Sequence, residues 1–251
     1  MELTLDHIRD MKIYQSKNGY RFSVDALLLY SFVNSLLAGK IADLGAGSGI
    51  IGLLLARKYP DADVSLFELQ KSLSAMAEKN IALNSLEKRV RVIRTDVRDM
   101  RTNSPRTDAG SFDMVVSNPP FRKERSGFVN PGEEKAIARH EITLKLAELV
   151  NAAHYLLKSK GRLFLIHHPA RLGELVSALR EKRMEIKRLR FVHSTASAEA
   201  KMVLVEAITG GRSGLKVERP LIIYSESGGY TDEMLVLYGV QSKEPPVVSG
   251  A

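Results

Sequence analysis

The stretch Ile41–Gly49, which reads IADLGAGSG, decides how the chain around it is expected to fold. Residues 40–44 predict a buried strand, and the apolar run Ile50–Lys58 directly after the stretch predicts a helix. Glycines between a strand and a helix permit a sharp turn and leave no Cβ in the way of a ligand, while the first backbone N–H groups of the helix face that ligand. This order of elements therefore predicts a ligand site at the end of the strand.

Beyond this stretch, short apolar runs alternate with longer amphipathic runs, a pattern typical of strand–helix units and a parallel sheet. We expect strands over residues 40–44, 63–67, 90–94, 112–117 and 161–167. The spacing of apolar residues predicts a helix over Leu73–Asn84. The alternation ends at Leu189–His193 and Met202–Ile208, two β-rich runs without a clear helix between them, which predict an antiparallel pair at a sheet edge.

The composition is that of a globular protein, since 44% of the 251 residues are hydrophobic and 26% are charged. We expect a single domain over residues 1–240, followed by a flexible Pro/Ser/Gly-rich tail over residues 241–251. Within this domain, residues 1–37 are interpreted as a helical extension, with Ser23 as the N-cap of a helix over residues 24–36.

The absence of cysteine excludes disulfides, thiolate metal ligands and thiol nucleophiles, and it favours a cytoplasmic protein without a metal centre. Residues Met1–Asp10 carry three acids and no unbroken apolar run, so we expect neither a signal peptide nor a membrane span there. The 37 Lys and Arg residues exceed the 29 Asp and Glu residues, and the formal net charge is +8. This excess favours a polyanionic partner without establishing one.

Acidic residues stand at the ends of three successive strands of the expected sheet: Asp43, Glu68 and Asp96. Open α/β sheets bind ligands outside the carboxyl ends of their strands, so these side chains are expected along one edge. There, Glu68 could accept both hydroxyls of a ribose, Asp96 could contact a purine edge, and Asp43 could hold a cationic or hydroxyl-bearing group. The alternative for each single acid is a helix cap or a solvated charge. Together the three acids predict a nucleoside site.

The segment Gly47–Gly52 also matches the dinucleotide pattern G-x-G-x-x-G, which leaves a nicotinamide-dependent oxidoreductase as an alternative of a different class. In a dinucleotide site the first glycine directly follows the strand, whereas here the turn begins at Gly45 and Asp43 stands at the strand end. A carboxylate at that position repels a diphosphate. The dinucleotide alternative is therefore the weaker one.

The expected strand over residues 112–117 runs directly into Asn118-Pro119-Pro120-Phe121. The two prolines remove two backbone donors and fix φ, so this segment forms a rigid edge of carbonyl groups. The Asn118 side-chain oxygen and a carbonyl of Asn118 or Pro119 could accept both hydrogens of an sp² amino group, while Phe121 stacks on the attached ring. Such an amine points its lone pair toward a methyl donor. The alternative is an ordinary turn.

The run Asp43–Gly49 resembles the first motif of the class I S-adenosylmethionine-dependent methyltransferases, and the resemblance covers about residues 20–210. It implies an α/β, Rossmann-like fold: a seven-stranded, mostly parallel sheet with helices on both faces and a C-terminal antiparallel hairpin. It also implies S-adenosyl-L-methionine as the cofactor, with the extension over residues 1–37 covering its site. The expected cofactor-binding residues are Asp25 (by resemblance alone), Asp43, Gly45, Gly47, Gly49, Glu68, Asp96, Val97 and Asn118.

The segment N-P-P-F resembles a motif of methyltransferases that act on amino nitrogens of adenine, guanine or glutamine. Residues 19–29, 138–141 and 230–233 are similar to bacterial tRNA adenine-N(6) methyltransferases that modify the adenine beside the anticodon. This resemblance implies adenine in tRNA as the substrate, with Asn118, Pro119, Pro120 and Phe121 as the catalytic residues. Those enzymes commonly carry Tyr where this chain has Phe121. An rRNA guanine-N(2) enzyme, a protein glutamine-N(5) enzyme and a non-catalytic cofactor-binding adaptor therefore remain alternatives.

Basic residues directly follow this segment and are expected to flank the pocket and contact RNA: Arg122, Lys123, Arg125 and Arg139. His167 and His168 are interpreted as structural residues at a strand end rather than as catalytic groups. We expect no membrane partner, and a monomer or weak dimer.

Overall fold

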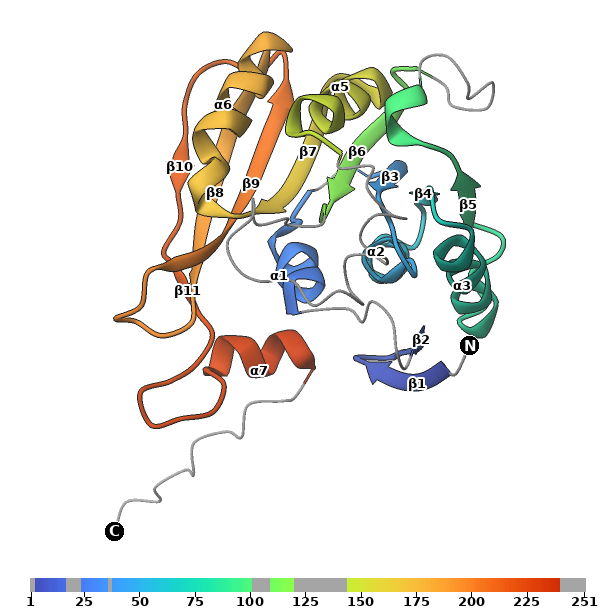
Figure 1. Cartoon of the computed structure of the whole chain (residues 1–251), viewed down its shortest axis with the longest axis horizontal. Helices are drawn as coiled ribbons and strands as arrows, with labels where there is room; N and C mark the ends of the chain where they lie inside the picture. The colour runs from blue at the N-terminus through green and yellow to red at the C-terminus, as the bar shows by residue number, and fades with distance from the viewer. Residues whose placement is uncertain (1–2, 17–23, 36–37, 101–108, 120–143, 240–251) are drawn as a thin grey trace, which may run out of the picture.

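The computed structural model of this protein describes residues 3–16, 24–35, 38–100, 109–119 and 144–239, which form a central sheet between two layers of helices (Figure 1). The strands of the sheet are β3 (Lys40–Leu44), β4 (Asp63–Glu68), β5 (Val90–Arg94), β6 (Phe112–Ser117), β7 (Leu157–His167), β8 (Met184–His193), β9 (Ala200–Thr209), β10 (Lys216–Val217) and β11 (Leu221–Ile222). The helices are α1 (Val24–Phe32), α2 (Ile50–Lys58), α3 (Lys71–Leu83), α5 (Leu146–Leu156), α6 (Leu172–Glu181) and α7 (Asp232–Tyr238), with short 3-10 helices η1 (Val97–Asp99) and η2 (Pro169–Arg171).

The strand order across the sheet is β10-β8-β9-β7-β6-β3-β4-β5, and β11 also pairs with β8. Strand β9 is antiparallel to both of its neighbours, while the other pairs are parallel. This confirms the predicted mostly parallel sheet with a C-terminal antiparallel pair. The prediction of seven strands was wrong, because the described residues alone form a sheet of nine strands. The two additional strands, β10 and β11, are two residues long, too short to show a period in the sequence.

Each face of the sheet is covered by its own helices. On one face, Ile41 and Met114 belong to an apolar cluster that includes residues of α1, α2, α3 and α7. On the other face, their neighbours Ala42 and Val115 pack with residues of α5 and α6. Strands that are apolar on both faces are expected where helices cover a parallel sheet on both sides. The predicted helices on both faces are therefore confirmed.

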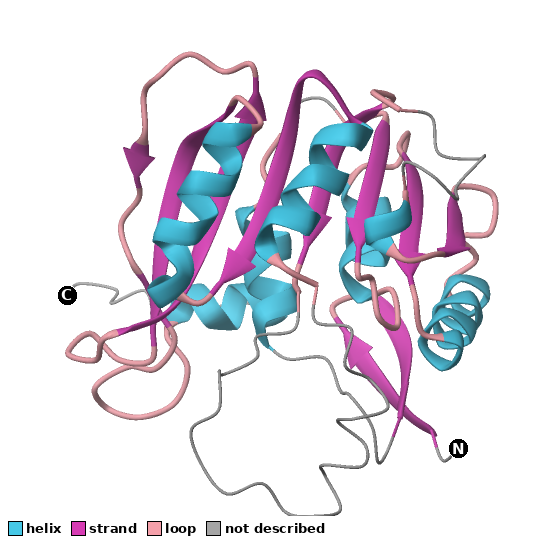
Figure 2. Cartoon of the chain, turned by 45° about the horizontal axis from the view of Figure 1, so that its top comes forward, coloured by secondary structure: helices cyan, strands magenta, loops and turns pink. Residues whose placement is uncertain are grey.

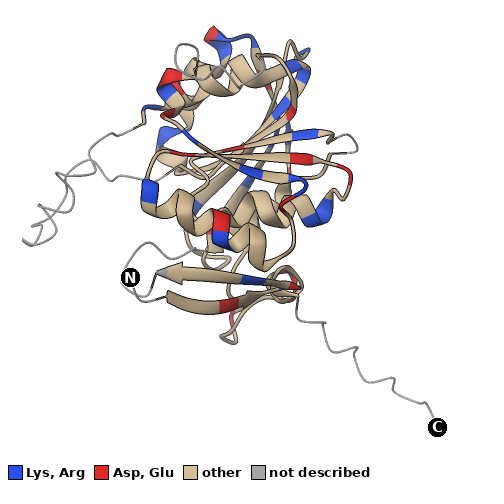
Figure 3. Ribbon diagram, turned by 90° about the vertical axis from the view of Figure 1, so that its right-hand side faces the viewer, with Lys and Arg blue, Asp and Glu red and all other residues tan. Residues whose placement is uncertain are grey.

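The N-terminal segment differs from the predicted helical extension, since only α1 is helical in its described part. Strands β1 (Leu3–Ile8) and β2 (Met11–Ser16) form an antiparallel hairpin whose turn contains Arg9 with a φ of 55°. Every second residue of β2 is buried, beginning with Met11 and Ile13. This period of two is the signal of a half-buried strand that the sequence interpretation missed. Figure 3 shows the hairpin on the outer side of the helical layer.

The carboxyl ends of the parallel strands lie along one edge of the sheet, called here the carboxyl edge, which points downward in Figure 2. The hairpin and the loop after β11 both lie toward this edge. Ser23 and residues 241–251 are outside the described residues. In the part of the chain that the structure describes, no helix is long and apolar enough to cross a membrane.

Candidate active site

The loop between β3 and α2 has a backbone conformation that favours glycine. Gly45, Gly47 and Gly49 have φ angles of 72°, 58° and 88°, in the left-handed region. A Cβ added to Gly45 or Gly47 would meet no atom of the described residues within 4 Å, whereas at Gly49 it would lie 2.9 Å from Cδ1 of Leu66. The first two glycines therefore leave the backbone open to a ligand, and the third lets α2 pack closely on the sheet.

Glu68 holds this loop against the end of β4. Its Oε2 accepts a hydrogen bond from the Gly47 N–H at 2.8 Å, and its Oε1 accepts one from the Gln70 N–H at 2.8 Å. The N–H groups of Gly45 and Ala46 both donate to the carbonyl of Phe67, at 2.9 and 3.0 Å. Each carboxylate oxygen has more than one acceptor position, so Glu68 can also accept hydrogen bonds from a ligand's hydroxyl groups.

Asp43 lies behind the loop and is 1% exposed. Its Oδ2 accepts a hydrogen bond from the Gly52 N–H at 3.0 Å, whereas its buried Oδ1 has no hydrogen-bond partner among the described residues. The pKa of Asp43 is raised to about 7, mainly by burial; the Gly52 N–H lowers it, and the charge of Glu68 adds to the rise. An unpaired buried oxygen next to the glycine loop fits a ligand that carries an N–H donor or a positive charge.

A buried hydroxyl places Asn118 beside the glycine loop. Ser117, the last residue of β6, donates from Oγ to the carbonyl of Leu44 at 2.7 Å, and Leu44 directly precedes Gly45. Strand β3 lies between β4 and β6, so Gly45, Glu68 and Asn118 lie at the carboxyl ends of three adjacent strands. The sequence interpretation missed Ser117; a hydroxyl residue at the end of an apolar strand was the available signal.

The N-P-P-F segment is only partly within the described residues: Asn118 is half-buried and Pro119 is buried. The other predicted residues of this region lie outside the described residues, namely Pro120, Phe121, Arg122, Lys123, Arg125 and Arg139.

Asp96 makes the helix-cap contacts that were the alternative to a ligand contact. Its Oδ1 accepts a hydrogen bond from the backbone N–H of Arg98 at 2.9 Å, and its Oδ2 lies 2.5 Å from Nη2 of the same residue. The Arg98 guanidinium holds the pKa of Asp96 below its usual range. Val97 is buried in η1, and Asp25 is half-buried in the first turn of α1. A base contact at Asp96 would have to share oxygens that already bind Arg98.

Two asparagines that the sequence interpretation did not identify, Asn80 on α3 and Asn84 at the C-cap of this helix, connect the hairpin to this site. Asn80 accepts from the Tyr14 N–H at 2.7 Å, and donates to the carbonyls of Tyr14 at 3.2 Å and of Ser48 at 3.0 Å. Asn84, one helical turn later, accepts from the Lys12 N–H at 3.2 Å and donates to its carbonyl at 2.7 Å. The two side-chain amides therefore pair with β2 as a neighbouring strand would, and Asn80 also holds the glycine loop.

Leu69 is another residue that the sequence interpretation missed. It directly follows Glu68 and is 44% exposed, although its side chain is fully apolar. An apolar side chain next to Glu68 could cover the flat face of a ligand ring. An apolar residue after an acid at a strand end was the available signal.

His167 and His168, at the end of β7, have local structural contacts. His167 is 3% exposed, and its Nδ1 accepts a hydrogen bond from the His168 N–H at 2.8 Å. Burial lowers the pKa of His167. His168 accepts from the Ala170 N–H at 3.2 Å and caps η2. These contacts agree with the structural interpretation of both residues.

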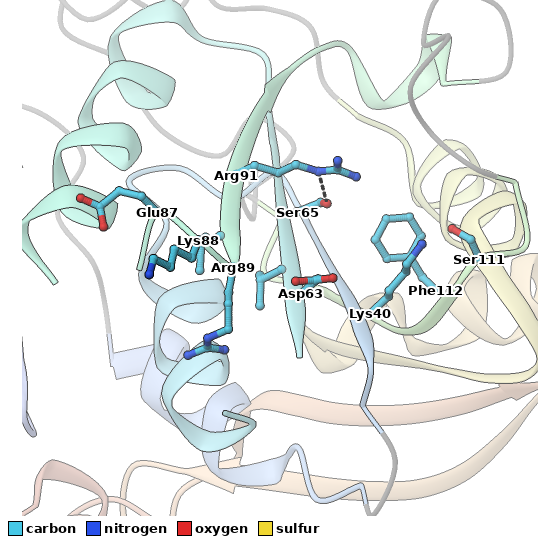
Figure 4. A pocket seen from close by; sticks show the side chains of 11 residues that line it. Lys40, Asp63, Ser65, Glu87, Lys88, Arg89, Arg91, Ser111 and Phe112 are labelled. Carbon is cyan, nitrogen blue, oxygen red and sulfur yellow. Dashed lines mark hydrogen bonds between the residues drawn. The ribbon is translucent and has the colours of Figure 1, made fainter. Parts of the chain in front are cut away.

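A cleft of about 370 Å³ lies at the opposite edge of the sheet, where β3, β4, β5 and β6 begin (Figure 4). Its charged lining residues are Lys40, Asp63, Glu87, Lys88, Arg89 and Arg91. The side chain of Arg91 donates to Ser65 Oγ at 3.1 Å. Because the glycine loop, Glu68 and Asn118 lie at the carboxyl edge, this cleft is separate from the candidate active site.

Comparison with known proteins identifies the family. Residues 23–183 match the family described as methyltransferase small domain. The tRNA1(Val) (adenine(37)-N6)-methyltransferase of Porphyromonas gingivalis is 33% identical over 202 residues, which cover 79% of this chain and 78% of that protein. The protein of the same name from Aeromonas hydrophila is 28% identical, with 86% of this chain and 88% of the relative covered.

Solved structures share the fold. A crystal structure described as a predicted O-methyltransferase from Agrobacterium tumefaciens aligns with a TM-score of 0.67 and 25% identity, covering 87% of this chain and 97% of that chain. The crystal structure of TrmN from Thermus thermophilus aligns with a TM-score of 0.52 and 19% identity, covering 73% of this chain and 48% of that chain. These likenesses confirm the predicted Rossmann-like methyltransferase fold. This chain belongs to the methyltransferase small domain family.

Proposed function

We propose that this protein transfers a methyl group from S-adenosyl-L-methionine to the exocyclic amino group of an adenine in tRNA, beside the anticodon. The observation that carries the proposal is the Ser117–Leu44 hydrogen bond of 2.7 Å, which places Asn118 next to the glycine loop. Asn118, the proposed acceptor for the amino group, is therefore adjacent to the glycine loop, the proposed site of the nucleoside cofactor. The names of the relatives from Porphyromonas gingivalis and Aeromonas hydrophila support tRNA adenine as the substrate.

The donors and acceptors around the glycine loop fit S-adenosyl-L-methionine. Gly45 and Gly47 leave space at the backbone, and Glu68 has acceptor capacity for ribose hydroxyls. The unpaired Oδ1 of Asp43 fits a cofactor that carries positive charge. We further assign Gly49, Asp25, Asp96, Val97 and Asn118 to the cofactor site.

When bound, the cofactor supplies an electrophilic methyl group on a sulfonium. In the proposed reaction, the Asn118 side-chain oxygen and the carbonyl of Asn118 or Pro119 accept hydrogen bonds from the amino group of the base. This draws the nitrogen lone pair out of conjugation and aims it at the methyl group. Pro120 keeps this edge rigid, and Phe121 stacks on the base. Positioning therefore supplies most of the rate, and the proton leaves to water after transfer.

The RNA would be bound by Arg122, Lys123, Arg125 and Arg139, which follow the N-P-P-F segment in the sequence. We propose that residues 1–240 act as one methyltransferase domain and that the protein works in the cytoplasm, as a monomer or weak dimer.

The test is incubation of the full chain with S-adenosylmethionine labelled in its methyl group and unmodified bulk tRNA, followed by digestion to nucleosides. Label in N(6)-methyladenosine supports the proposal. Label in guanosine would replace it by guanine-N(2) transfer. Cofactor binding without any labelled nucleoside would remove tRNA as the substrate, and ribosomal RNA and protein substrates would be tested next.

A further inference from the structure

Three tyrosine rings form a stack after β11. The ring centroids of Tyr224 and Tyr230 are 5.4 Å apart with 13° between their planes, and those of Tyr230 and Tyr238 are 5.1 Å apart with 30° between their planes. Tyr230 is therefore the middle ring and Tyr224 the outer one. Tyr224 is 44% exposed and Tyr230 is 40% exposed. Among the residues that the structure describes, no second ring stacks on Tyr224.

The attachment of α7 does not explain this exposure. Met234 and Leu237 of α7 are 0% and 9% exposed and belong to the apolar core. The Thr231 hydroxyl accepts a hydrogen bond from the Met234 N–H and caps the helix, and Arg9 donates to the carbonyl of Leu237 at 3.1 Å. The helix is thus held by buried side chains and by contacts at both of its ends. Large exposed aromatic surfaces that packing does not require are typical of binding sites.

The stack lies at the same edge of the sheet as the candidate active site. Leu221 and Ile222 pair in parallel with Val192 and His193, which are the last two residues of β8. The chain after β11 therefore lies beyond the carboxyl edge, as Figure 2 shows for this loop. Strands β7 and β9 lie between β6 and β8, so the ends of β6 and β8 are roughly 14 Å apart at the usual strand spacing. The glycine loop and Glu68 lie on the other side of β6.

The charges around the stack favour contact through the ring faces. The loop and the start of α7 carry three acids, of which Glu226 and Asp232 are exposed and Glu233 forms an ion pair with Arg190 at 2.7 Å. Phosphate groups would avoid these carboxylates, whereas uncharged planar bases stack on exposed tyrosines. Strand β9, which lies between β7 and β8, contains the exposed residue Lys201. Lys201 has no ion pair with any described residue. A phosphate that avoids the acids could be bound there.

We propose that Tyr224 and Tyr230 form a stacking platform for an unpaired base that flanks the target base of the RNA substrate. The inference rests on the proposed function, because it takes RNA as the substrate. Beyond that function, the inference states that the enzyme selects RNA that is single-stranded next to the target base. This single-stranded part would lie on the side of Asn118 that is opposite to the cofactor site. In a duplex the flanking base is paired and stacked and is not free to occupy the platform.

The first test uses fluorescence, since the chain contains no tryptophan. The Tyr224→Trp variant provides a single tryptophan in the stack, and the Leu215→Trp variant provides a matched one at a position that is 51% exposed outside the stack. We expect an RNA stem-loop with an unpaired loop to quench the first variant and a blunt RNA duplex to quench it far less. Equal quenching of both variants, or equal quenching by both RNAs, would overturn the proposal.

The second test uses kinetics of methyl transfer to a tRNA transcript. We expect Tyr224→Leu, which keeps an apolar side chain, to raise KM for tRNA about 5- to 100-fold, the usual range for the loss of one stacked base. KM for S-adenosylmethionine and the melting temperature should stay unchanged, and Tyr224→Phe should keep KM for tRNA close to the native value. An unchanged KM for tRNA in Tyr224→Leu would overturn the platform, as would an equal loss in Tyr224→Phe.

The two tests separate this inference from the proposed function. Methylation of adenine by the native chain together with a native KM for tRNA in Tyr224→Leu would reject the platform and keep the function. Quenching of Tyr224→Trp by the stem-loop without methylation of any RNA would reject the function and keep the RNA-binding surface.

Discussion

The two halves of the carboxyl edge are built in opposite ways. On the side of β3 and β4, called here the cofactor half, Asp43, Glu68 and Asn80 are 1%, 6% and 0% exposed. Each of these side chains is hydrogen-bonded to the glycine loop or to the first turn of the helix that follows the loop. On the side of β8 and β11, Tyr224 and Tyr230 are 44% and 40% exposed. A small ligand of constant shape can be bound by groups that are fixed in advance, because little ordering energy is then lost on binding. A large substrate is better served by an open stacking surface.

The largest effect is expected at the boundary between the two halves. Asn118→Ala removes an acceptor for the amino group of the base, so kcat should fall about 100-fold or more, as for the loss of one preorganised catalytic hydrogen bond. The dissociation constant for S-adenosylmethionine should change far less than kcat, since the glycine loop and Glu68 stay in place and Asn118 is one of several groups assigned to the cofactor site. Steady-state kinetics and calorimetric titration measure the two quantities. An unchanged kcat would remove Asn118 from the catalytic role.

The dependence of the cofactor half on buried amides is tested by a matched pair, Asn80→Ala and Asn84→Ala. Both variants leave backbone groups of β2 unsatisfied, so each should lower the free energy of unfolding by about 1–3 kcal/mol. Only Asn80 also bonds the carbonyl of Ser48, so only Asn80→Ala should weaken binding of S-adenosylmethionine, by about fivefold. Equal cofactor affinities in the two variants would contradict a link between the hairpin and the loop.

The buried charge in the cofactor half predicts a dependence of stability on pH. The pKa of Asp43 is raised from 3.8 to about 7 in the folded chain, so the folded state retains a proton that the unfolded state releases. Its contribution to stability is complete below about pH 4 and decreases as the pH rises through 7. Asp43→Asn cannot ionise, so its melting temperature should decline less than that of the native chain between pH 5 and pH 8. If the melting temperatures of the native chain and of Asp43→Asn changed with pH in parallel across this range, Asp43 would have an ordinary pKa.

The smallest effect is expected at Asp96, where the contacts are local and partly exposed. Asp96→Ala removes the cap of η1 and the ion pair with Arg98, which should cost about 1 kcal/mol of unfolding free energy. Since the pKa of Asp96 is lowered, its stabilisation is present at neutral pH and disappears in acid. Urea unfolding at pH 7 and pH 3 measures the difference. A tenfold loss of cofactor affinity in this variant would support the assignment of Asp96 to the cofactor site, whereas an unchanged affinity would leave Asp96 as the cap of η1 alone.

Features set by neighbouring residues were predictable from the sequence. The glycine spacing over Gly45–Gly49 agrees with the left-handed φ angles of all three glycines, and the apolar runs located the strands from β3 to β9. The hairpin was missed because its period of two was read as part of a helical segment. Strands β10 and β11 were missed because two residues carry no period, and they pair only once β8 offers an edge.

The sequence by itself determined the strand–helix alternation, the glycine loop and the acids at the strand ends, since these depend on local backbone preferences and on the period of apolar residues. Only the tertiary structure decided which polar groups meet. Asn80 reaches Tyr14, 66 positions earlier, and Ser117 reaches Leu44, 73 positions earlier. It also decided that Asp96 binds Arg98, that Asp43 is buried and that Tyr224 is exposed. Burial and pairing of this kind depend on the packing of distant segments, which no local pattern encodes.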